Sequence, residues 1–454
     1  MGITRKRIIW MLWIIVTVSI SSYYLYHLYS NDKRAFLPGP TSHGHHQIEM
    51  ACGACHTDPF GGGPVLQKAC VHCHGAALKA EDDSHPKSKF TDPRNADRVK
   101  KLDARHCVTC HVEHRPEITQ AMGVTVPTDV CFNCHADIAT DRPSHKGMAF
   151  DTCASAGCHN FHDNRGLYED FLDKHLDEPD ELDKYTSLEL DTPTRYTQHP
   201  GYPLQQYPLH ALTRSDADAP AAKLARAKPD WFTTSHTKAG VNCNACHLQK
   251  AKASAPAQWT DKPGYQACRQ CHAYQVKGFL SGMHGMRLDQ GLSPMTPAMA
   301  TLPMKQKAAH KALTCTTCHG AHQFDTRHAS IDACLGCHDD KHSLAYKKTA
   351  HYKLTKAEIT VSCATCHMPR VQHEEFDERF IAVEHNQNAN LRPNEKMLRS
   401  VCMNCHGLGF AIDALADPAL IENNFFGQPA RHIQSLDMAK QRLKTHKKKK
   451  KTTH

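Results

Sequence analysis

The longest uninterrupted run of apolar positions lies near the N-terminus. Residues 8–30 contain no Asp, Glu, Lys or Arg and begin with IIWMLWIIVTVSI. Three basic residues at positions 5–7 precede this run, and four tyrosines between positions 23 and 29 gather at its far end. About 20 apolar residues span a bilayer, basic residues stay in the cytoplasm and aromatic residues collect at the interfaces. We therefore expect residues 1–40 to form a cytoplasmic N-terminus and one transmembrane anchor. The alternative is a cleaved signal peptide, although this end offers no clear A-x-A site.

The rest of the chain is poor in apolar residues. A further helical spacing, i, i+3, i+4, i+7, occurs at residues 168–175. Hydrophobic residues make up 40% of the 454 positions and aromatic residues 7%. This length suggests two to four folded units at about 100–200 residues each, and the composition is thin for several hydrocarbon cores.

The 22 cysteines change this picture, because they form eleven pairs and a histidine directly follows each pair. Ten pairs have the spacing C-x-x-C-H, and the eleventh has four intervening residues. No cysteine is left over. The motifs are Cys52/Cys55/His56, Cys70/Cys73/His74, Cys107/Cys110/His111, Cys131/Cys134/His135, Cys153/Cys158/His159, Cys243/Cys246/His247, Cys268/Cys271/His272, Cys315/Cys318/His319, Cys334/Cys337/His338, Cys363/Cys366/His367 and Cys402/Cys405/His406.

C-x-x-C-H is the attachment motif of c-type haem. Both thiols form thioethers with the haem vinyl groups, and the adjacent histidine binds the iron as proximal ligand. Zinc knuckles, dithiol redox centres and a disulfide framework are the alternatives, but zinc does not require histidine at one fixed offset every time. For the expanded pair, the alternative is a disulfide beside an unrelated histidine. We therefore expect eleven covalent c-type haems, each holding one iron.

Each iron has a second axial position, and histidine is abundant enough to fill it. The 36 histidines leave 25 after the proximal ones, of which 22 lie outside the apolar N-terminal stretch and the basic tail. For any single residue, a solvated or core role is the alternative. His43, His45 and His46 all precede the first motif. The distal candidates that we favour are His43, His46, His85, His106, His114, His145, His175, His236, His284, His322, His342, His351 and His385.

The motif spacing also predicts the fold and its domains. Haems this dense must form much of the core, so we expect a mainly α fold with short helices, extensive ordered loops and little sheet. Five motifs lie within residues 52–159 and six within residues 243–406. We place a boundary near residue 195, in the cysteine-free gap. This gives two haem domains, a pentahaem domain with an acidic linker at 41–195 and a hexahaem domain at 196–439.

The formal charge of +9 belongs almost entirely to the C-terminus. Residues 440–454 carry eight Lys and Arg and no acid, which leaves +1 for the rest of the chain. A nucleic-acid partner is therefore not expected. We expect residues 440–454 to be a disordered basic tail. The alternative is a segment that docks on anionic lipid or on an acidic redox partner.

Two family resemblances rest on these motifs. The segment HHQIEMACGACH and the expanded CASAGCH site resemble the class III multihaem cytochromes of the c3/c7 type, over residues 43–175. The second half resembles the hydroxylamine oxidoreductase-like multihaem superfamily, in FLSGMHG at 279–285, CTTCHGAH at 315–322, DACLGCHDDKHSLAYKKTAHY at 332–352 and CATCHMPR at 363–370.

The second resemblance implies that His284, His322 and His351 are distal ligands, and less directly His342 and His385. Two departures weaken any carry-over of enzymatic activity. Only six motifs lie in this half, whereas the family's enzymes are mostly octahaem, and the chain has no C-x-x-C-K motif. The anchored chain with five initial motifs also resembles, in architecture alone, the pentahaem subunit of alternative complex III.

These observations predict a multihaem cytochrome c anchored in the bacterial inner membrane, with its haem domains in the periplasm. It would carry electrons from a quinol-oxidising membrane subunit or other cytochromes to a periplasmic or outer-membrane acceptor, and a homo-oligomer remains open. The alternative is an oxidoreductase that acts on a small nitrogen or sulfur oxyanion at one five-coordinate haem in the C-terminal domain. The residues considered for that site are His272, His284, Arg287 and His310.

Overall fold

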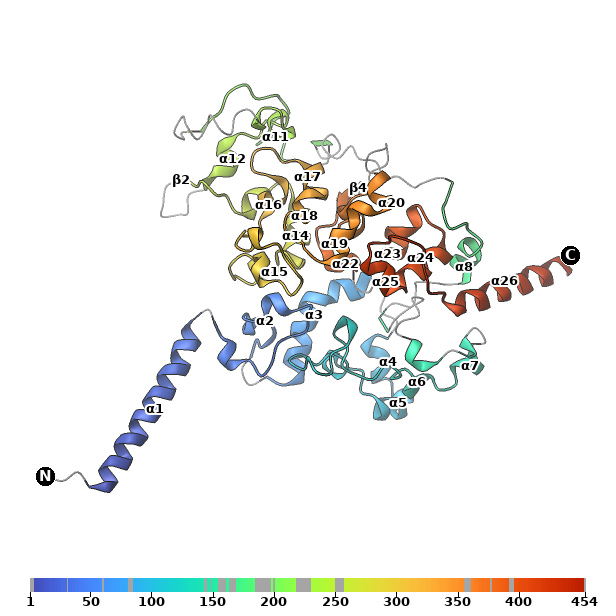
Figure 1. Ribbon diagram of the computed structural model, residues 1–454, viewed down its shortest axis with the longest axis horizontal. Coiled ribbons are helices and arrows are strands. Elements are labelled where there is room, and N and C mark those ends of the chain that lie inside the picture. Colours follow the sequence, from blue (N-terminus) through green and yellow to red (C-terminus); the bar gives the residue numbers. More distant parts are fainter. Residues whose placement is uncertain are drawn as a thin grey trace. The chain divides into compact units, whose positions relative to one another are not determined.

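The structure is a computed structural model of the chain (Figure 1). It describes residues 4–30, 32–58, 61–80, 85–142, 145–147, 149–153, 161–162, 169–183, 197–198, 201–217, 230–249, 257–354, 361–375, 378–391 and 396–452. Within these ranges the protein is mainly helical with few strands, which confirms the expected fold class.

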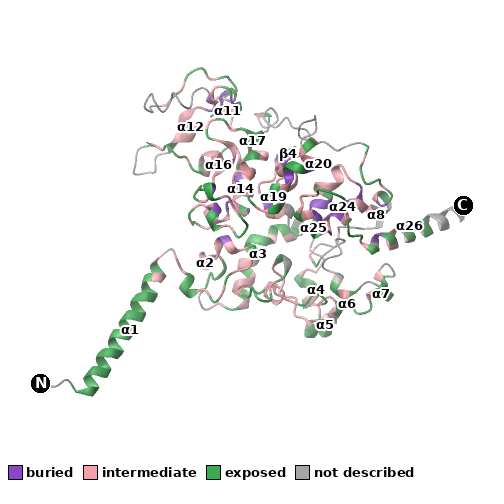
Figure 2. Ribbon diagram, viewed as in Figure 1, coloured by how far each residue is buried: buried purple, intermediate pink, exposed green. Residues whose placement is uncertain are grey.

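Helix α1 (Arg5–Tyr29) forms where the apolar run predicts it. Its side chains are exposed along almost its whole length, including Trp10, Trp13 and Tyr29 (Figure 2). Among the described residues it is the one helix long and apolar enough to cross a membrane. A helix that exposes apolar side chains on every face has no protein core to pack against, so a bilayer or removal of the segment would relieve that exposure.

The chain divides into two compact units, residues 1–76 with 87–127 and residues 77–86 with 128–454. The boundary expected near residue 195 lies outside the described residues, so the proposed domain limits stay a prediction. The helices that begin in the first unit are α1, α2 (Cys52–Cys55), α3 (Gly63–Ala80), α4 (Lys87–Thr91) and α5 (Ala96–Lys101).

The second unit is a succession of short helices with two small hairpins. The helices are α6 (Phe132–His135), α7 (Ile138–Asp141), α8 (Glu169–His175), α11 (Ser235–Lys238), α12 (Cys243–His247), α13 (Tyr265–Cys268), α14 (Ala273–Ser281), α15 (Met286–Asp289), α16 (Cys315–His319), α17 (Thr326–Ser330), α18 (Asp332–Leu335), α19 (Lys341–Ala345), α20 (Ala350–Leu354), α21 (Cys363–His367), α22 (Gln387–Leu391), α23 (Lys396–Ser400), α24 (Leu408–Leu415), α25 (Pro418–Glu422) and α26 (Gln434–Thr452).

Both hairpins are antiparallel. Strand β1 (Leu248–Gln249) pairs with β2 (Gln258–Trp259), and β3 (Arg370–Glu375) pairs with β4 (Glu378–Val383) in the register Arg370 opposite Val383. The remaining regular structure is 3₁₀ turns at Arg34–Phe36, His46–Ile48, Pro93–Asn95, Cys107–Thr109, Ala121–Gly123, Phe150–Thr152, Pro297–Met299, Gln306–Ala308, Tyr346–Lys348 and Cys402–Asn404.

Two small hydrophobic clusters lie among the described residues of the second unit. One joins α8, α23, α24 and α26 through Leu176, Leu398, Ile412 and Leu436, and Figure 2 shows buried residues on α24. The other surrounds Trp231 and includes Cys271 among its packed neighbours. Hydrocarbon packing therefore supports the ends of the haem-motif series, in agreement with the thin apolar composition.

The C-terminus differs from the expected disordered tail, because α26 continues as a helix to Thr452. Leu436 is 2% exposed, and Ala439 and Leu443 pack against the same cluster. These apolar positions recur at helical spacing and fix the first turns, and the Lys and Gln that follow are good helix formers. The composition of this segment indicates its positive charge but not its apolar stripe.

Candidate haem sites

The cysteine motifs form tight local turns. Four of them, in α2, α12, α16 and α21, are one-turn helices that begin at the first cysteine. Ser362 caps α21 through a capping box with Thr365, and Thr314 does the same for α16 with Thr317. In the other motifs, the backbone N–H of the histidine commonly donates to the backbone carbonyl of the first cysteine, as in His406 to Cys402 at 2.9 Å. Each turn therefore presents two thiols and one imidazole from five consecutive residues.

Motif histidines lie opposite a second imidazole in eight places among the described residues. In the N-terminal motifs, the ring centroids of His45 and His74 are 5.8 Å apart, and those of His85 and His135 are 6.1 Å apart. All six motif histidines of residues 243–406 have such a neighbour. The pairs are His236–His272 at 6.1 Å, His247–His322 at 5.8 Å, His284–His338 at 6.4 Å, His319–His385 at 6.3 Å, His342–His367 at 5.8 Å and His351–His406 at 6.2 Å.

This spacing fits an iron between the two rings. With metal–nitrogen bonds of about 2 Å on opposite sides of one ion, two imidazole centroids are separated by roughly 6 Å. The ring planes of six of these pairs are inclined by 63–88°, so face-to-face stacking does not account for them, whereas His247 and His322 are nearly parallel at 22°. Among the described residues, no three His, Cys, Asp or Glu side chains converge on a point that could hold a metal ion, as a zinc knuckle requires. The residues therefore fit c-type haem better than zinc.

Burial keeps several of these imidazoles neutral, which is the form that binds a metal. Desolvation, and to a smaller degree neighbouring histidines, lower the pKa of His272, His284 and His367 to about 4. The same burial, followed by the influence of His385 and His236, lowers the pKa of His319 to about 4. An uncharged imidazole presents a lone pair at neutral pH without first losing a proton.

Hydrogen bonds at Nδ1 fix the orientation of many of these rings, and at His342 the Nε2 atom also lies 3.0 Å from the Asn424 side-chain amide. The acceptor is usually a backbone carbonyl. The contacts are His85 to Phe161 at 2.5 Å, His247 to Thr260 at 2.7 Å, His342 to Ile421 at 2.5 Å, His385 to Val383 at 2.9 Å and His406 to Asp180 at 3.0 Å. His236 differs, because its buried Nδ1 has no hydrogen-bond partner.

The distal candidates fall into two groups. His85, His236, His284, His322, His342, His351 and His385 each lie opposite a motif histidine, as described above. His46, His114 and His175 make other contacts, with Glu49, with the Gly39 carbonyl and with Glu178 respectively. His106 has a buried Nδ1 without a partner, and burial lowers the pKa of His145. His43 also makes contacts, and the motif residues Cys158 and His159 lie outside the described residues.

Two further motif histidines, His56 and His111, lie near the N-terminus. His56 is exposed, and in the described part of the chain no imidazole lies opposite its ring, so the second ligand expected for its iron is not found there. His111 Nδ1 lies 3.1 Å from the Gly123 carbonyl, a contact that orients the ring as a ligand requires. We assign no second ligand to either site, and the role of both histidines as proximal ligands stays a prediction.

Cys134 and Cys337, the second cysteines of two motifs, each interact electrostatically with another thiol. Both are half-buried, and neither forms a disulfide with another described residue. Cys134 is in electrostatic contact with Cys131 of its own motif, whereas Cys337 contacts Cys318 of the preceding one. Among the described residues, neither thiol belongs to a cluster of three or more side chains that could bind a metal ion. The attachment of both cysteines to haem stays a prediction.

The imidazole beside His74 is His45, which the candidate set omits. Three histidines within residues 43–46 gave no sequence signal for choosing among them. A carboxylate makes the choice in the folded protein, because Glu113 accepts from His45 Nδ1 at 2.6 Å. This contact spans 68 residues and could not be read from local spacing.

The residues considered for an oxyanion site are not brought together. His272 lies opposite His236, and His284 lies opposite His338 rather than His272. Arg287 donates to the Ser293 carbonyl at 3.0 Å, and His310 is exposed.

Thiols of consecutive motifs influence one another's pKa, through a hydrogen bond or through space. In the first unit this joins Cys55 to Cys73 and Cys70 to Cys107. In the second unit Cys131 likewise contacts Cys153, and the motifs of residues 243–406 form an unbroken series. In chain order its contacts are Cys246 with Cys271, Cys268 with Cys315, Cys318 with Cys334, Cys334 with Cys363, and Cys366 with Cys402.

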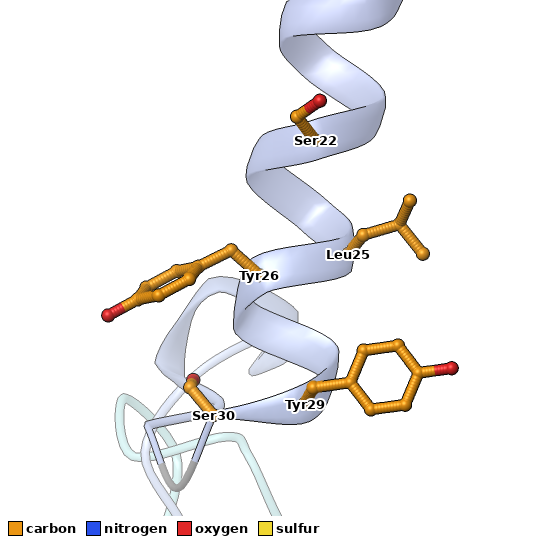
Figure 3. Close-up of a pocket in the computed structure, with 5 residues that line it drawn as sticks. All are labelled: Ser22, Leu25, Tyr26, Tyr29 and Ser30. Carbon is orange, nitrogen blue, oxygen red and sulfur yellow. The ribbon is translucent and has the colours of Figure 1, made fainter.

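A surface hollow also occurs at the end of α1, lined by Ser22, Leu25, Tyr26, Tyr29 and Ser30. Figure 3 shows Leu25 and Tyr29 extending to one side of the helix and Tyr26 to the other. They include no haem-attachment motif, so this hollow is not a candidate haem site.

The comparison with known families supports the haem interpretation of the N-terminal motifs. Residues 44–136 match the model of the family described as Cytochrome c3. The N-terminal region is a multihaem c-type cytochrome domain. The matched residues contain four of the eleven motifs, including His74 and His135 with their neighbouring imidazoles. Comparison with the curated proteins and with the solved structures found no match. The resemblance of the second half to the hydroxylamine oxidoreductase-like superfamily therefore stays a prediction.

Proposed function

We propose that the protein is a membrane-anchored, periplasm-facing cytochrome c that carries electrons along eleven covalently bound haems. It takes them from a quinol-linked membrane donor and passes them to a periplasmic or outer-membrane acceptor. The match of residues 44–136 supports multihaem electron transfer in general, and α1 is long and apolar enough to serve as the anchor. The number of haems, the donor and the acceptor belong to the proposal.

One observation carries this proposal furthest. Every motif histidine between residues 243 and 406 lies 5.8–6.4 Å from a second imidazole. Two imidazoles at each iron leave no position open for a substrate, which favours outer-sphere electron transfer over catalysis at a five-coordinate site. The oxyanion-reducing alternative receives no such support.

The chain's own residues perform three tasks in this function. The cysteine pairs fix each cofactor covalently, and the bound haem iron supplies one-electron chemistry. The imidazoles, held by carbonyl hydrogen bonds, keep their orientation, so little rearrangement is needed when charge changes. The contacts between consecutive motifs from Cys246 to Cys402 keep neighbouring sites close in chain order.

The test uses full-length protein extracted from membranes with detergent. Iron and haem analysis should give eleven per chain, and the ferric EPR spectrum should contain only low-spin signals. A high-spin component would instead support the five-coordinate alternative. Recovery of the loaded protein in the soluble fraction, with residues 1–30 removed, would contradict the retained anchor.

A further inference from the structure

Glu113 accepts three short hydrogen bonds. His45 Nδ1 and the Ser42 hydroxyl both donate to Oε1, at 2.6 Å and 2.7 Å, and the Ser42 backbone N–H donates to Oε2 at 2.6 Å. Glu113 and His45 are half-buried, so water screens their contact only in part. Ser42 therefore holds the carboxylate in one place against the imidazole that lies opposite His74.

This arrangement differs from the other paired sites. The rings of His247, His342 and His385 donate to neutral backbone carbonyls, and His236 Nδ1 has no partner. Asp340 comes within 3.3 Å of His338 Nδ1, but the same carboxylate caps α19 through Ser343. Ser343 holds Asp340 through its backbone N–H and its hydroxyl, much as Ser42 holds Glu113, so the two sites differ in the histidine contact itself, which is 0.7 Å shorter at His45–Glu113.

We propose that Glu113 is a positioning residue that gives His45 imidazolate character and thereby lowers the reduction potential of the haem attached at Cys70 and Cys73. The inference rests on the proposed function, in which His74 and His45 are the two axial ligands of that haem. The site would then take up an electron at lower potential than the sites whose ligands donate to backbone carbonyls.

The physical reason is the balance of charge at the site. Reduction adds one electron to the ferric iron and removes one unit of positive charge. A carboxylate that accepts from Nδ1 makes the imidazole a stronger donor through Nε2 and stabilises the ferric form. Hydrogen bonds to a charged acceptor are roughly twice as strong as those to a neutral one, so a carbonyl has a weaker effect.

The experiment compares full-length wild type with E113Q. Glutamine keeps an oxygen that accepts from His45 but removes the charge. A spectroelectrochemical titration should show one site of the eleven moving to higher potential. We expect its reduction equilibrium constant to rise about tenfold, the lower end of second-sphere effects, which is about 59 mV for one electron. A titration of E113Q that superimposes on wild type, at equal haem content, would overturn the proposal.

The matched control is E117Q, four residues further along the same segment. Glu117 is exposed and pairs with Arg115, so this variant removes one negative charge without touching a paired imidazole. Its titration should equal that of wild type. An equal shift in both variants would show a general charge effect and would count against the Glu113 contact.

A second measurement covers the case in which E113Q does not load fully. The ferric EPR spectrum of wild type should contain a low-spin component with compressed g values, the signature of an imidazolate-like ligand, and its absence overturns the inference. A haem count below eleven in wild type counts against the proposed function instead. An unchanged E113Q titration with eleven haems counts against Glu113 alone.

Discussion

At the scale of single residues, the paired imidazoles are alike in spacing and differ in what holds their second nitrogen. His45 has a carboxylate and His247 a carbonyl, whereas the buried Nδ1 of His236 has no partner. A ring without a hydrogen bond is a weaker donor to iron. We therefore expect the sites to differ in potential although their ligands are the same residue type.

His236 also provides a direct test of pairing. The H236A substitution should leave the iron at His272 with one axial imidazole, because His236 is the imidazole that lies opposite His272. The expected result is one new high-spin ferric EPR signal and one ferrous site per chain that binds carbon monoxide.

The control for this substitution is H310A, since His310 is exposed and was not found opposite a motif histidine in the described part of the chain. Its spectrum should equal that of wild type. If H236A shows no high-spin signal and binds no carbon monoxide at full haem content, the pairing of His236 with His272 is wrong.

The residue scale also shows the limit of sequence reasoning. The expected haem-attachment positions follow from the five consecutive residues of each C-x-x-C-H motif and can be predicted from the sequence alone. The partner of each motif histidine depends on tertiary folding. His322, for example, follows the motif of His319 directly but lies opposite His247. His45 and Glu113 were missed because their contact joins distant parts of the chain, and no local pattern marks it.

At the scale of elements, α26 is held to the second unit by an apolar stripe and by a histidine bridge. Leu436 packs in the cluster of Leu176, Leu408 and Ile412. Truncation in Leu436→Ala should remove about 2–5 kcal/mol of local stability, the usual cost of a buried leucine. The thermal midpoint of the second unit, followed by circular dichroism, should fall.

Leu302→Ala is the matched control, because Leu302 is 49% exposed and the same atoms are removed. We expect almost no change in its midpoint. Equal midpoints for the two variants would mean that α26 does not pack on this cluster.

The histidine bridge makes the docking of α26 depend on pH. His432 contacts Asp413 through Nδ1 at 2.7 Å and Asp437 through Nε2 at 2.9 Å. Hydrogen bonds with these two carboxylates raise the pKa of His432 above its ordinary value of 6.5. The stabilisation is therefore complete below pH 6.5 and is lost as the pH rises through the raised pKa.

Hydrogen exchange of the α26 amides provides the measurement. Their protection, after correction for intrinsic exchange, should be greater at about pH 6 than at about pH 9. In H432Q, which cannot gain the proton, this difference should disappear. A wild-type difference that persists in H432Q would assign the effect to another group.

At the scale of the whole molecule, the low apolar content agrees with a core in which haem-attachment motifs take the place of hydrocarbon side chains. The clusters around Ile412 and Trp231 are small for a chain of this length. Short helices with a motif at or near their ends bring imidazoles and thiols together instead. The fold class could be predicted because motif density leaves little room for regular sheet. The helical C-terminus could not, since the apolar stripe at 436–443 is short and followed by lysines.

The electron-carrying series is the central claim, and its most direct measurement is an anomalous difference map at the iron absorption edge from crystals of the haem-loaded protein. The account predicts eleven iron peaks per chain. Six of them should lie between the imidazole pairs of residues 236–406, in chain order from His247 to His406. A peak with only one imidazole in that series, or a motif without iron, would contradict the account.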